Sequence, residues 1–552
     1  MQTLEVKMTK INNLLSIAVL VLAMGWASCS ESAPRTEIVT TSGSLLGTLS
    51  PHDSAIAAFK GISFAKAPIG DLRWRPPQAP EAWTGVLAAT RAGAPCWQRL
   101  VPETSLYSRG QMEVSEDCLY LNVWSGARAD SEKLAVMVWF HGGGNTSGHG
   151  ASLIFDGTNL ARKGVVVVTA NYRLGPFGFL AHPALTAESS HNSSGNYALL
   201  DQIATLQWVH RNIEAFGGDP GRVTIFGQSA GALDVCLLMA SPLAKGLFHG
   251  VIGHSGGCMR TPSHLDAPDE QSSAHGFGLA IAAKLGVEGT DEIAAAALRA
   301  FTPEAFMEGA STAQVPLSSP IIDGWVLPDA PRRIFAAGEH NRVPVIAGVM
   351  ADEFRGLGAN ITEMAQADYE AQVKQRFPND SEAVLAMYKN MAETSTAEAL
   401  RKISTHSFFA WQSRTWATLV EAAGEDAYVY YFSHPTSVFS LYIPARKDFS
   451  VPGGTRGLGA YHSGDLAYAF NNVGLVGVEW QPWDYTLSDK ISDYWVNFAK
   501  TGNPNGADVP AWPPYRRAVD EVQEFADRIF TTENPLREQL NLFDGIYLDL
   551  TD

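Results

Sequence analysis

The segment that most constrains the fold is RVTIFGQSAGALDVCLLMA, residues 222–240. It begins with a β-branched apolar run at 222–226, and its second half has helical composition with no breaker before Pro242. Between the two halves, residues 227–231 fit the pattern G-x-S-x-G, in which a sharp strand-to-helix turn lifts a serine hydroxyl above a sheet. This local order predicts an α/β fold and makes Ser229 a candidate nucleophile.

A second fit to the same pattern lies at residues 253–257, around Ser255. The preceding run LFHGVI is compatible with a strand. Glycines and then Pro262 follow it, however, and these residues interrupt helices. Because the pattern needs a strand, a turn and a helix in succession, the sequence favours Ser229 over Ser255 as the nucleophile.

A serine nucleophile also needs hydrogen-bond donors for the oxyanion that forms on its substrate. The apolar run at 134–140 is typical of a buried strand, and His141 and three glycines follow it. Consecutive glycines let backbone N–H groups approach a ligand closely, as in the oxyanion loops of lipases and esterases, whereas the simpler alternative is an ordinary turn. The position after a strand and upstream of Ser229 favours an oxyanion loop, which the N–H group of Ala230 completes.

The acid and the base of such a site are expected downstream of Ser229, in that order. Asp352 and Glu353 follow the apolar run at 343–349, where a strand would end at the edge of the sheet that carries ligand sites. The residues alone leave the choice between these two carboxylates open. They also leave the base open among eight downstream histidines: His249, His254, His264, His275, His340, His406, His434 and His462.

The composition excludes several classes of partner. The 552 residues carry a net charge of −17, with 46% hydrophobic and 18% charged residues. Binding to nucleic acid or to an anionic membrane surface needs basic patches, so neither is expected. The cysteines and histidines show no metal-ligand spacing, and no metal or cofactor is expected.

The N-terminus has the organisation of an export signal. Lys7 and Lys10 precede the apolar run 14–24, which is too short to span a bilayer, and small residues follow it. We predict that residues 1–29 are a signal peptide and that the mature chain has no transmembrane span. Ala27 to Cys29 also resembles a lipobox, so Cys29 is a possible lipid anchor. The predicted location is the periplasm, the outer membrane as a lipoprotein, or the medium.

The whole chain from about residue 37 to 550 resembles the type-B carboxylesterases, a family that includes cholinesterases and bacterial para-nitrobenzyl esterases. The resemblance rests on FKGISFAKAPIGDLRWRPP, SEDCLYLNVW, VWFHGGG, TANYRLGPFGFL, the segment GNYALLDQIATLQWVHRNIEAFGGDPGRVTIFGQSAG, GVMADE and AYHSGDLAYAF. It implies a single α/β-hydrolase domain over 37–552, with a large, mostly parallel twisted sheet, helices on both faces and long insertions.

The same resemblance implies roles for individual residues. Ser229, Glu353 and His462 match the family's Ser–Glu–His triad, and Gly143, Gly144 and Ala230 match its oxyanion donors. Ser255 matches a serine beside the acid, where a hydrogen bond to Glu353 is expected.

The resemblance also makes structural predictions. Cys96 and Cys118, which flank a polar loop, match the family's first disulfide, and Arg73 with Glu116 matches an ion pair. Val287 stands where the family often has cysteine, so Cys236 and Cys258 are expected to be free thiols. The tryptophan that binds choline in animal cholinesterases has no match in the loop that holds Tyr107 and Ser108, so choline specificity is not expected.

These features predict a serine hydrolase that cleaves carboxylic esters through an acyl-enzyme, with a small-molecule ester as substrate. A lipase or an amidase of the same family is an alternative. A non-catalytic binding protein, like the cholinesterase-like adhesion proteins, is the alternative from another class. The sequence indicates no particular ester and no particular oligomeric state.

Overall fold

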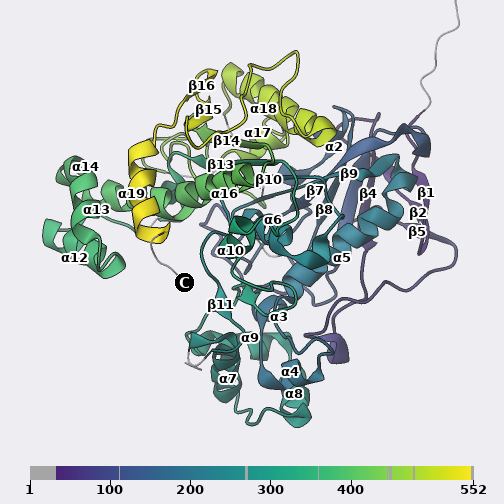
Figure 1. Ribbon diagram of the computed structural model, residues 1–552. Helices are drawn as coiled ribbons and strands as arrows, with labels where there is room; N and C mark the ends of the chain where they lie inside the picture. The colour runs from purple at the N-terminus through teal and green to yellow at the C-terminus, as the bar shows by residue number, and fades with distance from the viewer. Residues whose placement is uncertain are drawn as a thin grey trace, which may run out of the picture.

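A twisted sheet of eleven strands forms the centre of the described part of the chain (Figure 1). The computed structural model describes residues 33–110, 112–267, 272–358, 360–443, 446, 451–476 and 479–548. The predicted signal peptide at 1–29, and Cys29 within it, lie outside these residues.

In spatial order, the strands of this sheet are β16 (Ile529–Glu533), β15 (Glu521–Phe525), β14 (Ala427–Phe432), β13 (Val345–Met350), β10 (Gly250–His254), β9 (Gly218–Gln228), β7 (Leu134–Phe140), β8 (Val165–Ala170), β6 (Tyr120–Ser125), β4 (Ala57–Ser63) and β3 (Thr48–Leu49). The seven neighbouring strands from β15 to β8 are parallel. The outer strands pair antiparallel. The predicted large, mostly parallel sheet is therefore confirmed.

Two smaller sheets lie outside the main one. Strands β1 (Glu37–Thr40), β2 (Gly43–Leu46) and β5 (Val86–Ala88) form the first, and β11 (Ser263–His264) pairs with β12 (Ile321–Ile322) in the second.

The helices follow the strands or belong to the connections between them. They are α2 (Thr158–Ala161), α3 (Gly175–Phe179), α4 (Pro183–Glu188), α5 (Tyr197–Asn212), α6 (Ala230–Ala240), α7 (Ala274–Lys284), α8 (Glu292–Arg299), α9 (Pro303–Thr312), α10 (Pro331–Ala336), α11 (Glu353–Leu357), α12 (Gln366–Arg376), α13 (Ser381–Met387), α14 (Lys389–Thr394), α15 (Thr396–Ser404), α16 (Trp411–Ala422), α17 (Leu466–Ala469), α18 (Pro482–Thr501) and α19 (Arg537–Leu548). A π-helical turn at Thr405–Ala410 joins α15 to α16.

Both faces of the sheet are covered by helices. Successive side chains of a strand point to opposite faces, so β7 contributes to two cores. Val136 and Val138 pack in one core with residues of α5 and α6, whereas Met137 and Trp139 pack in the other with residues of α18. A strand that is buried on both faces is apolar throughout, which explains the run predicted at 134–140.

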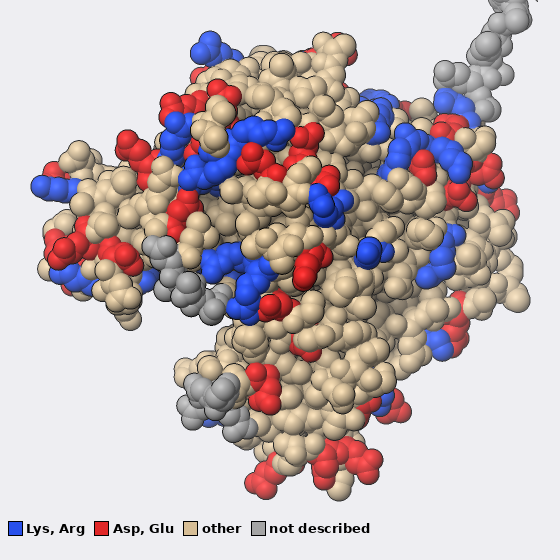
Figure 2. Space-filling model, in the orientation of Figure 1, with Lys and Arg blue, Asp and Glu red and all other residues tan. Residues whose placement is uncertain are grey.

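Two groups of helices project away from the sheet (Figure 1). One contains α7, α8 and α9, and the other contains α12, α13 and α14. On the face drawn in Figure 2, acidic and basic side chains are interspersed. The helical groups belong to the long insertions that the family resemblance implies.

The predicted disulfide and ion pair in the N-terminal part of the chain are confirmed, but the prediction of two free thiols is wrong. Cys96 and Cys118 form a disulfide with an S–S distance of 2.02 Å, and Arg73 forms an ion pair with Glu116 at 2.6 Å. Cys236 and Cys258, expected as free thiols, form a second disulfide with a Cα–Cα distance of 5.6 Å.

The sheet topology explains this second disulfide. Helix α6, which carries Cys236, follows β9, and Cys258 lies just beyond β10, the parallel neighbour of β9. Both segments therefore leave the same edge of the sheet, next to each other. The absence of a cysteine at position 287 concerns a different pairing, so it gives no information about whether Cys236 bonds to Cys258.

Candidate active site

Ser229 lies between β9 and α6, as the pattern predicts, in a backbone conformation with φ 58° and ψ −120°. The flanking glycines make this turn possible because the chain is packed against itself. A Cβ atom at Gly231 would lie 2.1 Å from the carbonyl oxygen of Phe140, and one at Gly227 would lie 2.4 Å from the carbonyl carbon of Gly231. Any larger residue at either position would collide with backbone.

Glu353 and His462 meet at the same edge of the sheet. Glu353 begins α11, just after β13, and His462 lies in the loop that precedes α17. Nδ1 of His462 lies 2.5 Å from Oε2 of Glu353, and the N–H group of Met350 donates to Oε1 at 2.9 Å. The exposed fractions are 0% for Glu353 and 2% for His462, so water does not compete for this hydrogen bond.

Asp352, the other carboxylate that the sequence left open, is engaged elsewhere. Its Oδ1 accepts a hydrogen bond from Nζ of Lys402 at 2.9 Å, and its Oδ2 accepts one from the N–H group of Ala460 at 3.0 Å. The geometry therefore selects Glu353 as the carboxylate that contacts the histidine.

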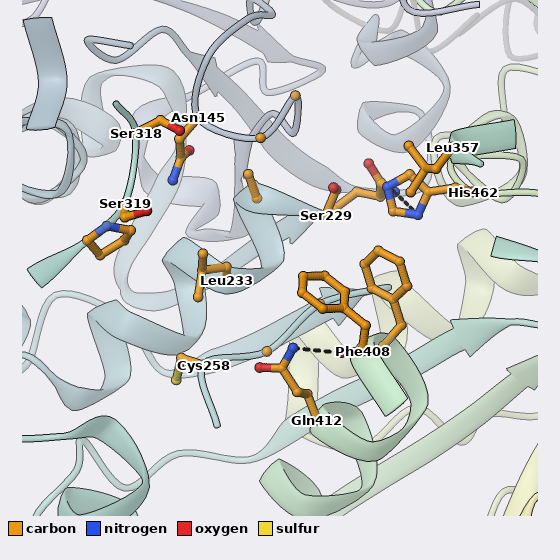
Figure 3. A pocket seen from close by; sticks show the side chains of 18 of the residues that line it. Asn145, Ser229, Leu233, Cys258, Ser318, Ser319, Leu357, Phe408, Gln412 and His462 are labelled. Carbon is orange, nitrogen blue, oxygen red and sulfur yellow. Dashed lines mark hydrogen bonds between the residues drawn. The ribbon is translucent and has the colours of Figure 1, made fainter. Parts of the chain in front are cut away.

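Ser229 and His462 both line a pocket of about 600 Å³. Figure 3 shows them on one side of it, with Ser318 and Ser319 across from them. Of the eight candidate histidines, only His462 is among the described residues that line this pocket. His254, by contrast, is buried against Asp465, with 2.8 Å between Nδ1 and Oδ2.

The predicted oxyanion donors line the same pocket. The backbone N–H groups of Gly143, Gly144 and Ala230 have no hydrogen-bond acceptor among the described residues. An unpaired N–H group at a cavity is available to a ligand. These three groups can therefore donate hydrogen bonds to an oxyanion that forms in the pocket.

A buried carboxylate holds the loop that carries Gly143 and Gly144. Asn145 donates from Nδ2 to Oδ1 of Asp234 at 3.0 Å, and Gln202 donates from Nε2 to Oδ2 at 2.7 Å. Burial raises the pKa of Asp234 to about 7, although both hydrogen bonds oppose the rise. Asp234 is part of α6, so the oxyanion loop is attached to the helix that begins after Ser229.

Three further side chains contact His462. The amide nitrogen of Gln228 lies 3.0 Å from Nε2, the Tyr107 hydroxyl donates to the backbone carbonyl of His462 at 3.1 Å, and the Phe409 ring lies 4.9 Å from the imidazole. Burial raises the pKa of Tyr107 well above its usual range, so its hydroxyl remains a donor. Neither Gln228, which stands inside the serine pattern, nor Phe409 was predicted from the sequence as a site residue.

The predicted hydrogen bond between Ser255 and Glu353 is wrong. Ser255 is buried, and its hydroxyl has no hydrogen-bond partner in the described part of the chain. Its N–H group donates to the carbonyl of Gly348 at 2.9 Å. The two carboxylate oxygens of Glu353 accept instead from the Met350 N–H group and from His462.

The sequence matches the model of the carboxylesterase family over residues 34–543. The chain belongs to the carboxylesterase family. A fumonisin B1 esterase of Sphingopyxis macrogoltabida is 34% identical over 511 residues, which cover 90% of this chain and 87% of that protein. The liver carboxylesterase of Sus scrofa is 32% identical over 542 residues, which cover 90% of each.

Solved structures agree with this assignment. The crystal structure of a Geobacillus stearothermophilus carboxylesterase is 30% identical, with a TM-score of 0.76, and the match covers 92% of this chain and 100% of that one. A PNB esterase is also 30% identical, with a TM-score of 0.75 and coverage of 92% and 99%. This carboxylesterase is therefore a carboxylic ester hydrolase with the α/β-hydrolase fold.

The described part of the carboxylesterase has neither a membrane-spanning helix nor a metal-binding cluster. Within the described ranges, no helix combines the length and the apolar character needed to cross a bilayer. No group of three or more histidine, cysteine, aspartate or glutamate side chains in these ranges has the arrangement of a metal site.

Proposed function

We propose that this carboxylesterase cleaves carboxylic esters through an acyl-enzyme on Ser229, with His462 as general base and Glu353 as the acid that orients it. The observation that carries the proposal is the 2.5 Å contact between Nδ1 of His462 and Oε2 of Glu353, at a pocket that Ser229 also lines. A carboxylate accepts only, so Nδ1 carries the hydrogen and Nε2 keeps its lone pair.

The acylation step follows from this tautomer. Nε2 of His462 takes the proton of the Ser229 hydroxyl while Oγ attacks the ester carbonyl carbon. The carbonyl oxygen becomes an oxyanion, to which the N–H groups of Gly143, Gly144 and Ala230 donate. His462 then passes its proton to the leaving alkoxide oxygen as the C–O bond breaks, which releases the alcohol and leaves the acyl group on Ser229.

Deacylation repeats the sequence with water. His462 removes a proton from a water molecule, whose oxygen attacks the acyl carbonyl carbon. The second tetrahedral intermediate is stabilised by the same donors. It collapses when His462 returns the proton to Oγ of Ser229, and the carboxylic acid leaves. The proton taken from water thus replaces the one that left with the alcohol, so protons balance over the cycle.

We also propose that residues 1–29 are a signal peptide and that 37–552 form the mature hydrolase domain. The two disulfides support export, since disulfides are rare in reducing compartments. The periplasm, a lipid anchor on Cys29 and release into the medium are the three forms that this proposal allows.

A comparison of two serine variants tests the mechanism. Ser229→Ala is expected to lower kcat at least about 10⁴-fold on 4-nitrophenyl butyrate and to abolish labelling by a fluorophosphonate probe. Ser255→Ala serves as the matched control, because its hydroxyl has no partner, and it is expected to keep both. If Ser229→Ala still reacts with the probe while Ser255→Ala does not, the nucleophile is Ser255.

A further inference from the structure

Among the described residues that line the active-site pocket, one has a permanently charged side chain. Arg260 lies at the wall of the pocket, just beyond β10, and no aspartate, glutamate or lysine is among the described residues that line it. The chain as a whole has 57 acidic and 40 basic residues. Arg260 is therefore the one arginine or lysine among the described residues that line the pocket, in a protein whose net charge is −17.

The guanidinium of Arg260 is held in place by uncharged groups. Its Nη2 donates to the carbonyl of Ser407 at 3.3 Å and to the hydroxyl of Tyr547 at 3.2 Å. Its central carbon lies 5.1 Å from the centre of the Phe408 ring and 5.2 Å from that of Tyr547. Nε and Nη1 have no acceptor among the described residues, so two donor groups remain for a ligand.

A second arginine contacts the same serine as Arg260, although it is not among the described residues that line the pocket. Arg376 donates to the hydroxyls of Ser404 and Ser407 at 2.8 and 2.7 Å. Its pKa is lowered mainly by burial and also by the charge of Arg260, so the two guanidinium groups lie within electrostatic range. Neither forms an ion pair with a described carboxylate.

Two buried arginines of the fold differ in this respect. The buried guanidinium groups of Arg173 and Arg414 are neutralised by Asp201 and by Asp520 with Asp544. Arg260 is exposed, stacks on two aromatic rings and has no ion-pair partner among the described residues, so its guanidinium is accessible to an anionic group. A guanidinium binds a carboxylate through parallel N–H donors in one plane.

We propose that Arg260 binds a carboxylate carried by the substrate, so that the preferred esters have an anionic group in addition to the ester that is cleaved. Apolar side chains such as Leu233, Leu357 and Phe408 line the same pocket and fit the hydrocarbon part of such an ester. The proposal rests on the proposed function of Ser229, because it assigns a substrate class to that site.

Two matched pairs of esters test it, and they distinguish where the carboxylate sits. For the acyl side, the pair is mono-4-nitrophenyl adipate and its methyl-capped neutral form. For the alcohol side, it is 4-carboxyphenyl butyrate and its methyl ester. In each pair, the measured quantity is the ratio of kcat/KM for the anionic ester to kcat/KM for the neutral one.

Arg260→Gln is expected to lower this ratio about 10-fold to 100-fold in at least one pair, which identifies the side that carries the carboxylate. The kcat/KM for the neutral esters should change by less than about 3-fold, and Arg260→Lys should retain part of the preference. The control is Arg222→Gln, which removes the same charge at the start of β9, away from the pocket, where Arg222 pairs with Asp219. Thermal unfolding checks that each variant is folded.

The neutral esters separate failure of this inference from failure of the proposed function. If wild type hydrolyses them and Arg260→Gln leaves both ratios unchanged, the role of Arg260 is overturned and the function of Ser229 stands. If Ser229→Ala hydrolyses all four esters at the same rate as wild type, the proposed function is overturned. The inference about Arg260, which rests on that function, is then overturned too.

Discussion

The side-chain amide nitrogen of Gln228 lies 3.0 Å from Nε2 of His462, and Gln228 immediately precedes Ser229 in the chain. An amide N–H group only donates, so this contact requires a lone pair on Nε2. That is the tautomer in which Nδ1 donates to Glu353. Gln228 therefore favours the neutral imidazole, but it occupies the one lone pair of Nε2, so this contact has to break before the same nitrogen can take the proton of Ser229.

We expect Gln228→Glu to move the acidic limb of the pH profile of kcat/KM to higher pH, by roughly one unit. A carboxylate at this distance stabilises the protonated ring, so a higher pH is needed to form the base. Gln228→Met is the uncharged control; it loses only the hydrogen bond that favours the neutral ring, so its limb should move in the same direction but by much less. Profiles on a neutral ester from pH 5 to pH 9 make the comparison, and an unmoved limb in Gln228→Glu would contradict it.

Glu353→Gln is expected to lower kcat by about 10³-fold to 10⁴-fold, because an amide at this position can hold the wrong tautomer of His462. Loss of the negative partner should also move the acidic limb to lower pH. Asp352→Asn is the neighbouring control, since Asp352 contacts Lys402 and not His462. Its kcat should remain within a few-fold of wild type. Equal losses in the two variants would show that Glu353 has no special coupling to the base.

Asp234 should make stability depend on pH in a characteristic direction. Its pKa in the folded protein is about 7, against an ordinary value of 3.8, because burial disfavours the charged form. Between these two pH values the unfolded chain releases the proton while the folded chain retains it. The contribution of Asp234 to the free energy of unfolding is therefore fully present below pH 4. It decreases by roughly 4 kcal/mol as the pH rises to 7.

Asp234→Asn removes this titration, so the free energy of unfolding of the variant relative to wild type should rise between pH 4 and 7 and then level off. The side-chain amide of Gln202 can rotate so that its Oε1, which has no partner among the described residues, accepts a hydrogen bond from the introduced asparagine amide. Urea unfolding at several pH values measures the difference. A difference that does not vary with pH would show that Asp234 keeps an ordinary pKa in the folded state.

The second disulfide should be present in the mature protein and should contribute to stability. Cys236 and Cys258 are 22 residues apart, and closing a loop of that size stabilises a fold by about 3 kcal/mol in the chain-entropy account. Cys236→Ser with Cys258→Ser should lose about that much in urea unfolding and also some activity, because Cys258 lines the pocket. The Cys96→Ser with Cys118→Ser variant gives the comparison for the other bridge.

Thiol counting on the denatured, unreduced protein provides the direct check of connectivity. It should find none of these four cysteines free, and peptide mapping should link Cys236 to Cys258. Recovery of Cys236 and Cys258 as free thiols would contradict the second disulfide and agree with the prediction from sequence.

The sequence by itself determined the elements whose signals are local. Strand β7 has the bounds of its apolar run, and α6 begins directly after the serine, because the run, the turn glycines and the helix formers are neighbours along the chain. Strand β13 begins two residues later than the run at 343–349 predicted, since strand ends depend on the neighbours that pair with them. The overall sheet and the position of Ser229 followed from such local order together with the family resemblance.

Only the tertiary structure decided which distant side chains meet. Glu353 and His462 are 109 residues apart, and the packing that turns Asp352 towards Lys402 selects Glu353 for the contact. The bridge between Cys236 and Cys258, and the lack of a partner for the Ser255 hydroxyl among the described residues, contradicted the predictions from sequence for the same reason. Side-chain direction and the spacing between separate strands depend on sheet order and packing, and no pattern of neighbouring residues encodes them.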